Sequence, residues 1–212
     1  MTSSDDPFRR QDETPDELFY RQPRFVTHID DAAMAAVTQL YREFLPAGGA
    51  LLDLMSSWVS HLPPEVAYRR VVGLGLNRAE LTKNPRLESF VVQNLNTTPQ
   101  LPFADGEFGG AALAVSVDYL TDPVAVLRDL RRVLVPGGPV VIAFSNRCFP
   151  TKAVAIWHRL NDRERLELVG HYFQEAGWEQ IQLLDRSPKG HGSDPLYAAV
   201  AYASSGSQER RG

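Results

Sequence analysis

The sequence has few of the features that mark secreted, membrane-bound or nucleic-acid-binding proteins. It contains a single cysteine, Cys148, so no disulfide can form within the chain. No apolar run approaches the roughly 20 residues that a membrane-spanning helix needs. Acidic residues exceed basic ones only slightly, 26 against 22, and such a chain lacks the basic surface that nucleic acids bind. We therefore expect a cytoplasmic protein without membrane or nucleic-acid partners.

Several familiar catalytic motifs are also missing. There is no GxxxxGK[ST] phosphate-binding loop and no GxSxG segment, which argues against a P-loop nucleotide hydrolase and against a serine hydrolase. Gly73-Leu74-Gly75 does not extend into the GxGxxG pattern of nicotinamide-binding proteins. Because the histidines match no metal-binding spacing, we expect no metal site; the histidines considered are His28, His61 and His191.

The composition is that of an ordinary globular protein. Hydrophobic residues make up 43% of the chain and charged residues 23%, and 212 residues are enough to bury the core of one domain. The polar ends carry no periodic apolar pattern. We therefore predict one domain at residues 18–204, with disordered tails at 1–17 and 205–212.

Apolar runs and amphipathic segments alternate along the chain. Strands are predicted at residues 50–54, 67–76, 87–95, 111–117, 140–144, 178–184 and 196–202. Helices are predicted at 28–45, 77–83, 122–134, 151–160 and 162–176, and one or two helical turns at 56–61. Such alternation indicates an α/β fold with a mainly parallel sheet and helices on both faces. No helix separates the last two strands, so we expect an antiparallel hairpin at one edge.

The predicted topology also indicates where a ligand would bind. In open α/β sheets, ligands lie beyond the carboxyl ends of the parallel strands, at the point where the strand order reverses. The segments that follow the strands are 53–57, 74–77, 94–95, 116–119 and 145–147. We expect these five segments to surround the site.

Two motifs resemble a known family. The segment LPFADGEF, residues 101–108, resembles the LPF-x-D-x-x-F segment of class I S-adenosylmethionine-dependent methyltransferases of the type 11 kind. The segment LRRVLVPGG, residues 130–138, resembles the helix and turn that follow the fourth strand in that family. The resemblance covers residues 45–150. It implies a Rossmann-like fold with seven strands, S-adenosylmethionine as the cofactor and methyl transfer to a small-molecule acceptor.

The first cofactor loop departs from the family pattern. The family has an acidic residue followed by a glycine-rich turn, and here the acid is present as Asp53. Met55, Ser57 and Val59 stand where the glycines are usual. Glycine at such places allows positive φ and close approach of a ligand, so we expect these side chains to crowd the methionine half of the cofactor.

The second and third strands depart from the pattern as well. The family places an acid at the end of the second strand, where it binds the ribose hydroxyls, but this sequence has Gly75, with Asn77 two residues further on. Glycine offers only backbone groups to a ligand. After the third strand the family often has an acid that faces the adenine amino group. Asn94 stands there, and its side-chain carbonyl can still accept that hydrogen bond.

The resemblance nevertheless implies a set of cofactor contacts. The hydroxyls of Ser56 and Ser57 are expected to receive the cofactor carboxylate, together with nearby backbone N–H groups, and Arg24 is a further candidate for it. In the aromatic segment 19–28, Tyr20 or Phe25 can shield the sulfonium; the alternative is an apolar strip with Arg24 in solvent. The predicted cofactor-binding residues are Arg24, Asp53, Leu54, Met55, Ser56, Ser57, Gly75, Leu76, Asn77, Asn94, Leu95 and Ser116.

The acceptor is expected on the other side of the cleft. Asp118 and Tyr119 follow the fourth strand, where the family places substrate-facing groups, and Asn146 follows the fifth. Asp118 can take a proton from a hydroxyl or amine acceptor, although it can equally cap the following turn. Cys148 would need a depressed thiol pKa to act as a nucleophile, and we expect it to be a small apolar residue instead.

Two functional hypotheses follow. In the first, the loop binds the cofactor and the chain transfers a methyl group. In the second, the chain is a non-catalytic, methyltransferase-like binding or scaffold protein whose cofactor site has degenerated. The segment SSWVSH at residues 56–61 places polar and aromatic side chains at the expected ligand site, which favours a retained ligand.

Overall fold

The computed structural model describes residues 6–190 and 192–204. Within them the strands are β1 (Ala50–Leu54), β2 (Arg70–Gly75), β3 (Ser89–Val92), β4 (Gly110–Ala114), β5 (Pro139–Phe144), β6 (Glu179–Asp185) and β7 (Tyr197–Tyr202). The helices are α1 (Asp16–Phe19), α2 (Asp31–Phe44), α3 (Arg78–Lys83), α4 (Pro123–Val133), α5 (Ala155–Arg159) and α6 (Asp162–Glu175), with a 3-10 turn, η1 (Val117–Tyr119).

The strands form one sheet in the order β3-β2-β1-β4-β5-β7-β6. The first five strands pair in parallel, whereas β7 pairs antiparallel with both β5 and β6. This confirms the predicted mainly parallel sheet and the antiparallel hairpin at one edge. Successive strands run outward from β1 in one direction and from β4 in the other. The strand order therefore reverses between β1 and β4, which is where ligand sites form in such sheets.

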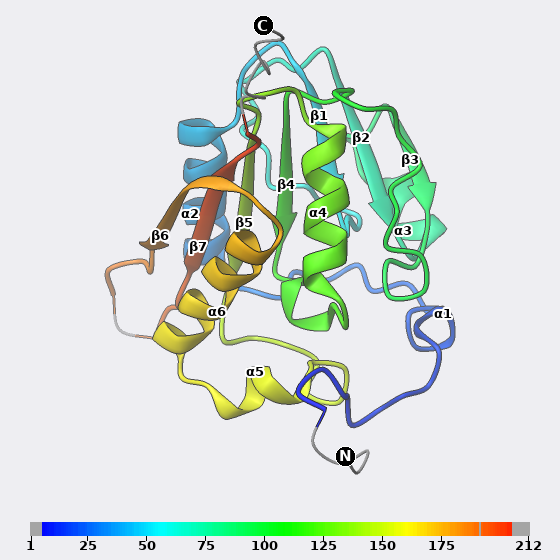
Figure 1. Cartoon of the computed structure of the whole chain (residues 1–212), viewed down its shortest axis with the longest axis vertical. Coiled ribbons are helices and arrows are strands. Elements are labelled where there is room, and N and C mark those ends of the chain that lie inside the picture. Colours follow the sequence, from blue (N-terminus) through cyan, green and yellow to red (C-terminus); the bar gives the residue numbers. More distant parts are fainter. Residues whose placement is uncertain (1–5, 191, 205–212) are drawn as a thin grey trace, which may run out of the picture.

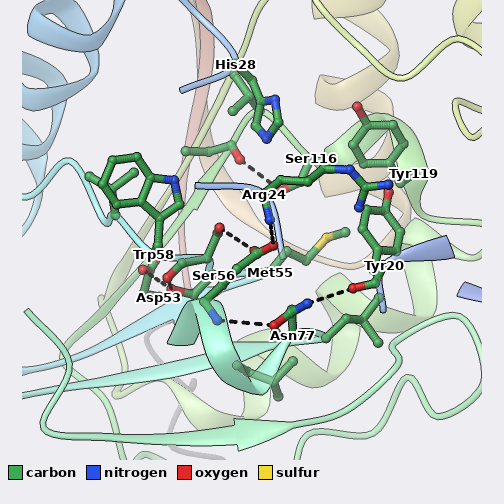
Figure 2. A pocket seen from close by; sticks show the side chains of 18 of the residues that line it. Tyr20, Arg24, His28, Asp53, Met55, Ser56, Trp58, Asn77, Ser116 and Tyr119 are labelled. Atoms are coloured by element: carbon green, nitrogen blue, oxygen red, sulfur yellow. Dashed lines mark hydrogen bonds between the residues drawn. The ribbon is translucent and has the colours of Figure 1, made fainter. Parts of the chain in front are cut away.

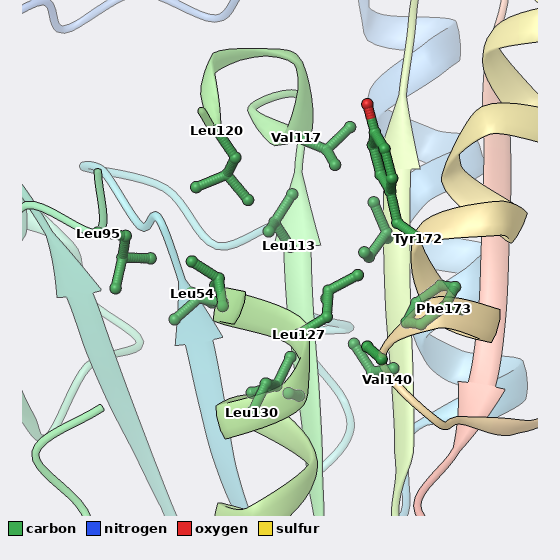
Figure 3. Close-up of a cluster of buried hydrophobic side chains, with 14 of the residues drawn as sticks. Leu54, Leu95, Leu113, Val117, Leu120, Leu127, Leu130, Val140, Tyr172 and Phe173 are labelled. Carbon is green, nitrogen blue, oxygen red and sulfur yellow. The ribbon is translucent and has the colours of Figure 1, made fainter. Parts of the chain in front are cut away.

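The central strands of the sheet are buried on both faces because helices cover each of them. Figure 1 shows α4 and α6 in front of the sheet and α2 behind it. The larger core lies between the sheet and the front helices, where Leu54 and Leu113 pack against Leu127, Leu130 and Phe173 (Figure 3). A second core joins α2 to the other face. This explains why the sequence of β1 and β5 is apolar at consecutive positions.

Polar side chains fix the starts of α2, α3 and α4. The Asp30 carboxylate accepts from the N–H of Ala33 at the start of α2, and the Asn77 side chain caps α3. Asp122 caps α4, with Pro123 at its first position. Each such cap contributes about 1 kcal/mol. These caps are local, which is why the sequence alone indicates them.

Residues 56–61 do not form the predicted helical turns. The Ser56 N–H donates to the carbonyl of Leu74 on β2, and His61 has a φ of 52°, which no right-handed helix contains. The predicted helix at 151–160 is also shorter, because α5 begins only at Ala155. Here the N–H of Val154 donates to the carbonyl of Asp118, and so it is directed away from the helix. Both differences arise from partners that are distant in sequence.

The N-terminal segment differs from the expected tail in residues 6–17. The N–H of Asp12 donates to the carbonyl of Thr151, and Arg9 and Pro7 accept from the first residues of α5. The fully buried Lys152 lies 3.2 Å from the carboxylate of Asp16 and donates to the carbonyl of Thr14. Figure 1 shows this segment, in blue, along the lower edge, where the parallel strands end. Residues 1–5 and 205–212 of the predicted tails lie outside the described residues.

Candidate functional site

A pocket lies at the carboxyl ends of β1, β2, β3 and β4, where the topology places a ligand. Its empty volume is about 1200 Å³, including the open mouth. Tyr20, Arg24 and His28 of the N-terminal part of the chain also line it (Figure 2), as does Phe149, which follows β5.

Asp53, at the end of β1, is held by two serines. The hydroxyls of Ser56 and Ser60 donate to the same carboxylate oxygen, Oδ2, at 2.5 and 2.6 Å. The side-chain amide of Asn84 donates in turn to the Ser60 hydroxyl at 2.8 Å. Burial raises the pKa of Asp53 to about 6, against the lowering effect of the two serine hydrogen bonds. The carboxylate is therefore fixed in orientation and charged at neutral pH.

The pocket wall contains an unusual concentration of backbone strain. Met55, His61 and Val115 all have positive φ values, at 53°, 52° and 43°, and all three line the pocket. Residues with a side chain rarely adopt this conformation, least of all β-branched ones such as valine. Strain of this kind persists only where the surroundings impose it, and it often accompanies functional sites. Met55 keeps the backbone shape that a glycine would adopt, although its side chain is present.

The end of β2 is shaped by a close approach of the loop after β1. A Cβ atom at Gly75 would overlap the carbonyl oxygen of Ser56, while the Ser56 N–H donates to the Leu74 carbonyl at 2.8 Å. The loop therefore lies directly against the strand. No side chain, acidic or otherwise, fits at position 75 in this arrangement.

Glu80 is a further carboxylate of the pocket that was not predicted from the sequence. It lies in the first turn of α3 and lines the pocket. Its Oε2 accepts from the hydroxyl of Ser57 at 2.6 Å, and its Oε1 accepts from the backbone N–H of Arg24 at 2.7 Å. One sequence feature could have identified Glu80. It lies three residues after Asn77, which caps a helix that begins at the ligand-binding edge of the sheet.

Two predicted cofactor residues tie the N-terminal segment to the sheet. The side-chain amide of Asn77 donates to the carbonyl of Tyr20 at 2.8 Å while its oxygen caps α3. The amide of Asn94 donates to the carboxylate of Glu17 at 2.8 Å, and its oxygen accepts from the N–H of Asn96. Both side chains therefore hold the segment that contains Glu17 and Tyr20 in place over the pocket.

Arg24 is enclosed by aromatic rings. Its guanidinium carbon lies 4.8 Å from the ring centre of Phe19, 5.5 Å from that of Tyr20 and 5.1 Å from that of Phe149. Nη2 donates to the Phe19 carbonyl at 3.0 Å, whereas Nη1 is buried and has no hydrogen-bond partner among the described residues. The guanidinium is therefore stacked in the pocket wall, with one donor unused.

An aromatic rim borders the mouth of the pocket. The indole N–H of Trp58 donates to the carbonyl of Val26 at 3.1 Å, and the rings of Trp58 and Phe25 meet edge to face at 6.4 Å. Phe25 and Val26 are about half exposed. His28 contacts the ring of Phe149 at 5.1 Å, and burial together with His28 lowers the pKa of His61. The loop after β1 and the N-terminal segment are thus joined at this rim.

The predicted acceptor residues occupy different places. Tyr119 lines the pocket, and its hydroxyl accepts from the N–H of Phe149 at 2.8 Å. Asp118 is buried behind the pocket wall; burial raises its pKa to about 7, and its Oδ2 has no hydrogen-bond partner among the described residues. Asn146 is exposed and does not line the pocket. Burial and the neighbouring Asp118 raise the pKa of Cys148, which is the opposite of what a nucleophilic thiol requires.

The pocket brings together most of the predicted site. The predicted residues that line it are Arg24, Asp53, Met55, Ser56, Ser57, Gly75, Leu76, Asn77, Asn94, Leu95, Ser116 and Tyr119. Leu54, Asp118 and Asn146 do not line it; Leu54 is fully buried in the core. Lining residues to which the sequence analysis assigned no role include Asp16, Glu80, Gln93 and Asn96.

The described residues contain no cluster of three His, Cys, Asp or Glu side chains that could hold a metal ion. His191 lies outside the described residues. None of the helices in the described part of the chain combines the length and apolar character needed to cross a bilayer.

Comparison with known families supports the resemblance seen in the sequence. A family model described as a methyltransferase domain matches residues 56–142. Uncharacterised proteins of Mycobacterium tuberculosis and Mycobacterium bovis are 40% identical over 50 residues, which is 24% of this chain and 18% of those proteins. The match to these relatives therefore spans less than a fifth of their length.

Solved structures share the fold. The [4+2]-cyclase SpnF aligns with a TM-score of 0.61 and 16% identity, covering 80% of this chain and 81% of the cyclase. Phosphoethanolamine N-methyltransferase 2 of Haemonchus contortus, solved with S-adenosyl-L-methionine, aligns with a TM-score of 0.60 and 13% identity, covering 80% and 52%. At these identities the likeness concerns the fold alone. It agrees with the seven-stranded Rossmann-like sheet described above.

Proposed function

Given that the chain resembles class I S-adenosylmethionine-dependent methyltransferases in both sequence and fold, we propose that it binds S-adenosylmethionine in this pocket and methylates a small-molecule acceptor. One observation carries the proposal. All the residues assigned to the cofactor except Leu54 line one pocket at the reversal of strand order, and apart from Arg24 they come from the ends of separate strands.

The residues of the β1 loop suit the methionine part of the cofactor. Asp53 is oriented by Ser56 and Ser60 and carries a negative charge at neutral pH, so it attracts the amino group. Leu76 and Leu95 are placed to flank the adenosine part, with Asn77 and Asn94 beside them. When bound, S-adenosylmethionine supplies an electrophilic methyl group. The protein then contributes mainly alignment, which accounts for much of the rate of such a substitution.

The stacked Arg24 suits the carboxylate of the cofactor. Its Nη1 donor has no partner among the described residues although it is buried, and an unpaired buried donor is costly. A bound carboxylate would supply the missing acceptor. The ring of Tyr20 lies beside this guanidinium and lines the same pocket, where an aromatic face can stabilise a sulfonium.

Tyr119 is the best placed group for the acceptor. Burial and Asp118 raise the pKa of its phenol, so Tyr119 remains neutral. The phenol oxygen accepts from the N–H of Phe149, and its own proton faces the Asp118 side chain. We propose that Tyr119 orients the acceptor. In this proposal the proton lost by the acceptor passes to the Tyr119 oxygen while the Tyr119 proton passes to Asp118 behind it, and Asn146 lies towards the outer end of the acceptor.

Isothermal titration calorimetry with S-adenosylmethionine and S-adenosylhomocysteine tests the proposal. We expect saturable binding of both ligands, weakened about tenfold or more by Asp53→Ala, with Glu88→Gln as a matched control on an exposed carboxylate outside the pocket. A folded wild-type sample that gives no heat at millimolar ligand contradicts the proposal.

That negative result would favour the second hypothesis, a non-catalytic methyltransferase-like binding protein. The side chains of Met55, Ser57 and Val59 line the pocket where glycines are usual, and they leave less room for the cofactor. The fold neighbour SpnF is a [4+2]-cyclase, so this fold is not confined to methyl transfer.

A further inference from the structure

Three carboxylates line the pocket, and their surroundings differ. Asp16 is neutralised, because Arg10 and Lys152 lie 2.7 and 3.2 Å from its Oδ1 and the amide of Asn96 donates to its Oδ2. Asp53 lies at the end of β1 and receives two serine hydroxyls on one oxygen. Glu80 differs from Asp16, since no lysine, arginine or histidine side chain forms an ion pair with it among the described residues, and from Asp53, since each of its two oxygens accepts one hydrogen bond.

The acceptor capacity of Glu80 is only half used. Each carboxylate oxygen has two lone pairs. Oε1 accepts one hydrogen bond, from the backbone N–H of Arg24, and Oε2 accepts one, from the Ser57 hydroxyl. One lone pair remains on each oxygen, at the wall of the pocket. Two adjacent hydroxyl groups could be accepted side by side.

The cationic side chain nearest to Glu80 in the chain of hydrogen bonds, Arg24, does not use its guanidinium to bind it. Arg24 meets it through the backbone, and Figure 2 shows the guanidinium of Arg24 reaching away towards Tyr20 and Tyr119. The negative charge of Glu80 acts to raise the pKa of His28, but burial outweighs it and lowers that pKa. A carboxylate without a cationic partner binds neutral hydroxyl donors more readily than one already neutralised.

Position 75 cannot supply such a carboxylate. A Cβ atom there would overlap the backbone oxygen of Ser56, which is not the flexible end of a side chain. Glu80 lies on α3, the helix that follows β2. A Cβ at Gly75 would also meet the side chain of Leu81, the residue after Glu80. Of the three carboxylates that line the pocket, Glu80 is the one carried by α3, the element that follows β2 in the chain.

We propose that Glu80 is the residue that accepts the two ribose hydroxyls of a bound nucleoside, and that it makes the pocket selective for ribonucleosides over deoxyribonucleosides. Carboxylates bind ribose hydroxyls in this way in other doubly wound sheets, from the end of a strand. Here the same recognition comes from the first turn of a helix. The inference rests on the proposed function, because it places a nucleoside cofactor in this pocket.

Titration of two ligands into two forms of the protein distinguishes loss of the ribose contact from a general loss of binding. The affinities of adenosine and 2′,3′-dideoxyadenosine are measured by calorimetry for the wild-type protein and for Glu80→Gln. We expect the wild type to prefer adenosine by ~10-fold to ~100-fold. In Glu80→Gln that preference falls to a few-fold, while 2′,3′-dideoxyadenosine binds with nearly unchanged affinity. An equal loss for the two ligands, or no loss, overturns the inference.

Two further variants serve as controls. Glu88→Gln removes an exposed carboxylate outside the pocket and should leave both affinities unchanged. Ser57→Ala removes one donor to Glu80 but keeps the carboxylate, so the preference for adenosine should persist even if both affinities fall. Thermal unfolding of each variant establishes that it is folded, and loss of the preference in folded Ser57→Ala would contradict the role given to Glu80.

S-adenosylhomocysteine distinguishes this inference from the proposed function. If it binds while the preference for adenosine does not depend on Glu80, the inference fails and the cofactor proposal stands. If it does not bind but the preference depends on Glu80, the pocket takes a different ribonucleoside ligand and methyl transfer is wrong. If none of the three ligands binds the folded protein, both proposals are overturned.

Discussion

The loop after β1 and the last residue of β2 touch each other, and they carry opposite kinds of residue. The loop has Met55 and Ser57 where the family resemblance implies glycines, and Met55 has the positive φ that glycine would favour. The strand has Gly75 where the resemblance implies an acid, and the loop backbone occupies the space of a side chain there. The two positions are coupled, because the loop can approach β2 this closely only if position 75 lacks a Cβ.

Replacing Gly75 should break this arrangement most severely. In Gly75→Ala the new Cβ overlaps the Ser56 carbonyl, so the loop or the strand must shift. We expect a loss of about 3 kcal/mol in the free energy of unfolding, at the upper end for overpacking, measured by urea denaturation.

Gly73→Ala is a matched control in the same strand. There the new Cβ meets the end of the Leu87 side chain, which can rotate away. The loss should be clearly smaller than at position 75. Equal losses in the two variants would mean that contact with the loop backbone is not what requires Gly75.

Asp53, at the start of the loop after β1, should make the free energy of unfolding depend on pH. Burial raises the pKa of Asp53 to about 6, above the unfolded value near 4, so the fold favours the protonated form. The stabilisation of the fold by protonated Asp53 is fully present below pH 4 and is lost as the pH rises through 6. Asp53→Asn removes it, so relative to wild type the variant should be more stable at pH 8 than at pH 4 by about 1–3 kcal/mol. Urea denaturation at the two pH values measures the difference, and a constant offset would contradict the raised pKa.

The backbone N–H of Arg24 joins the N-terminal part of the chain to α3 through Glu80, whereas its guanidinium extends towards Tyr20 and Tyr119 (Figure 2). If that guanidinium binds the cofactor carboxylate, Arg24→Gln should weaken S-adenosylhomocysteine about tenfold. It should leave 5′-methylthioadenosine, which has no carboxylate, nearly unaffected. Calorimetry gives both values, and a parallel loss for the two ligands would assign Arg24 to packing instead.

Restoring a glycine in the loop should have the smallest effect. Met55→Gly relieves the positive φ, which is worth about 1 kcal/mol, but it removes a side chain that packs partly buried against the core. The two terms oppose each other, so we expect a net change in unfolding free energy below about 1 kcal/mol. Affinity for S-adenosylhomocysteine should increase because the pocket gains room. Reduced affinity in a folded variant would mean that Met55 contacts the ligand favourably.

The sequence predicted the sheet and its ligand-binding edge because these depend on local patterns. Apolar runs, caps such as Asn77 and the missing helix between the last strands are each visible within a short stretch of chain. Glu80 escaped prediction because its importance depends on the contact between Ser56 and Gly75. The helical turns at 56–61 failed for a related reason, since the serine hydroxyls bind Asp53 and the backbone follows β2.

The N-terminal segment also depends on distant residues. Its sequence is polar, and no local pattern indicates that Asp16 pairs with the buried Lys152. A polar segment reads as a tail unless its partner is known. The ordering of residues 6–17 therefore could not be predicted without the structure.

That pairing has a consequence for the order in which the protein forms during synthesis. The carbonyl of Thr14 and the ammonium of Lys152 are 138 positions apart in the chain, so the segment leaves the ribosome long before its partner exists. Contacts with such large separation in sequence form late, because the intervening chain must first be closed into a loop. The N-terminal segment can therefore take its place over the pocket only after β1 to β5 have been synthesised. Until then, the ligand-binding edge of the nascent sheet is open to the surrounding solution.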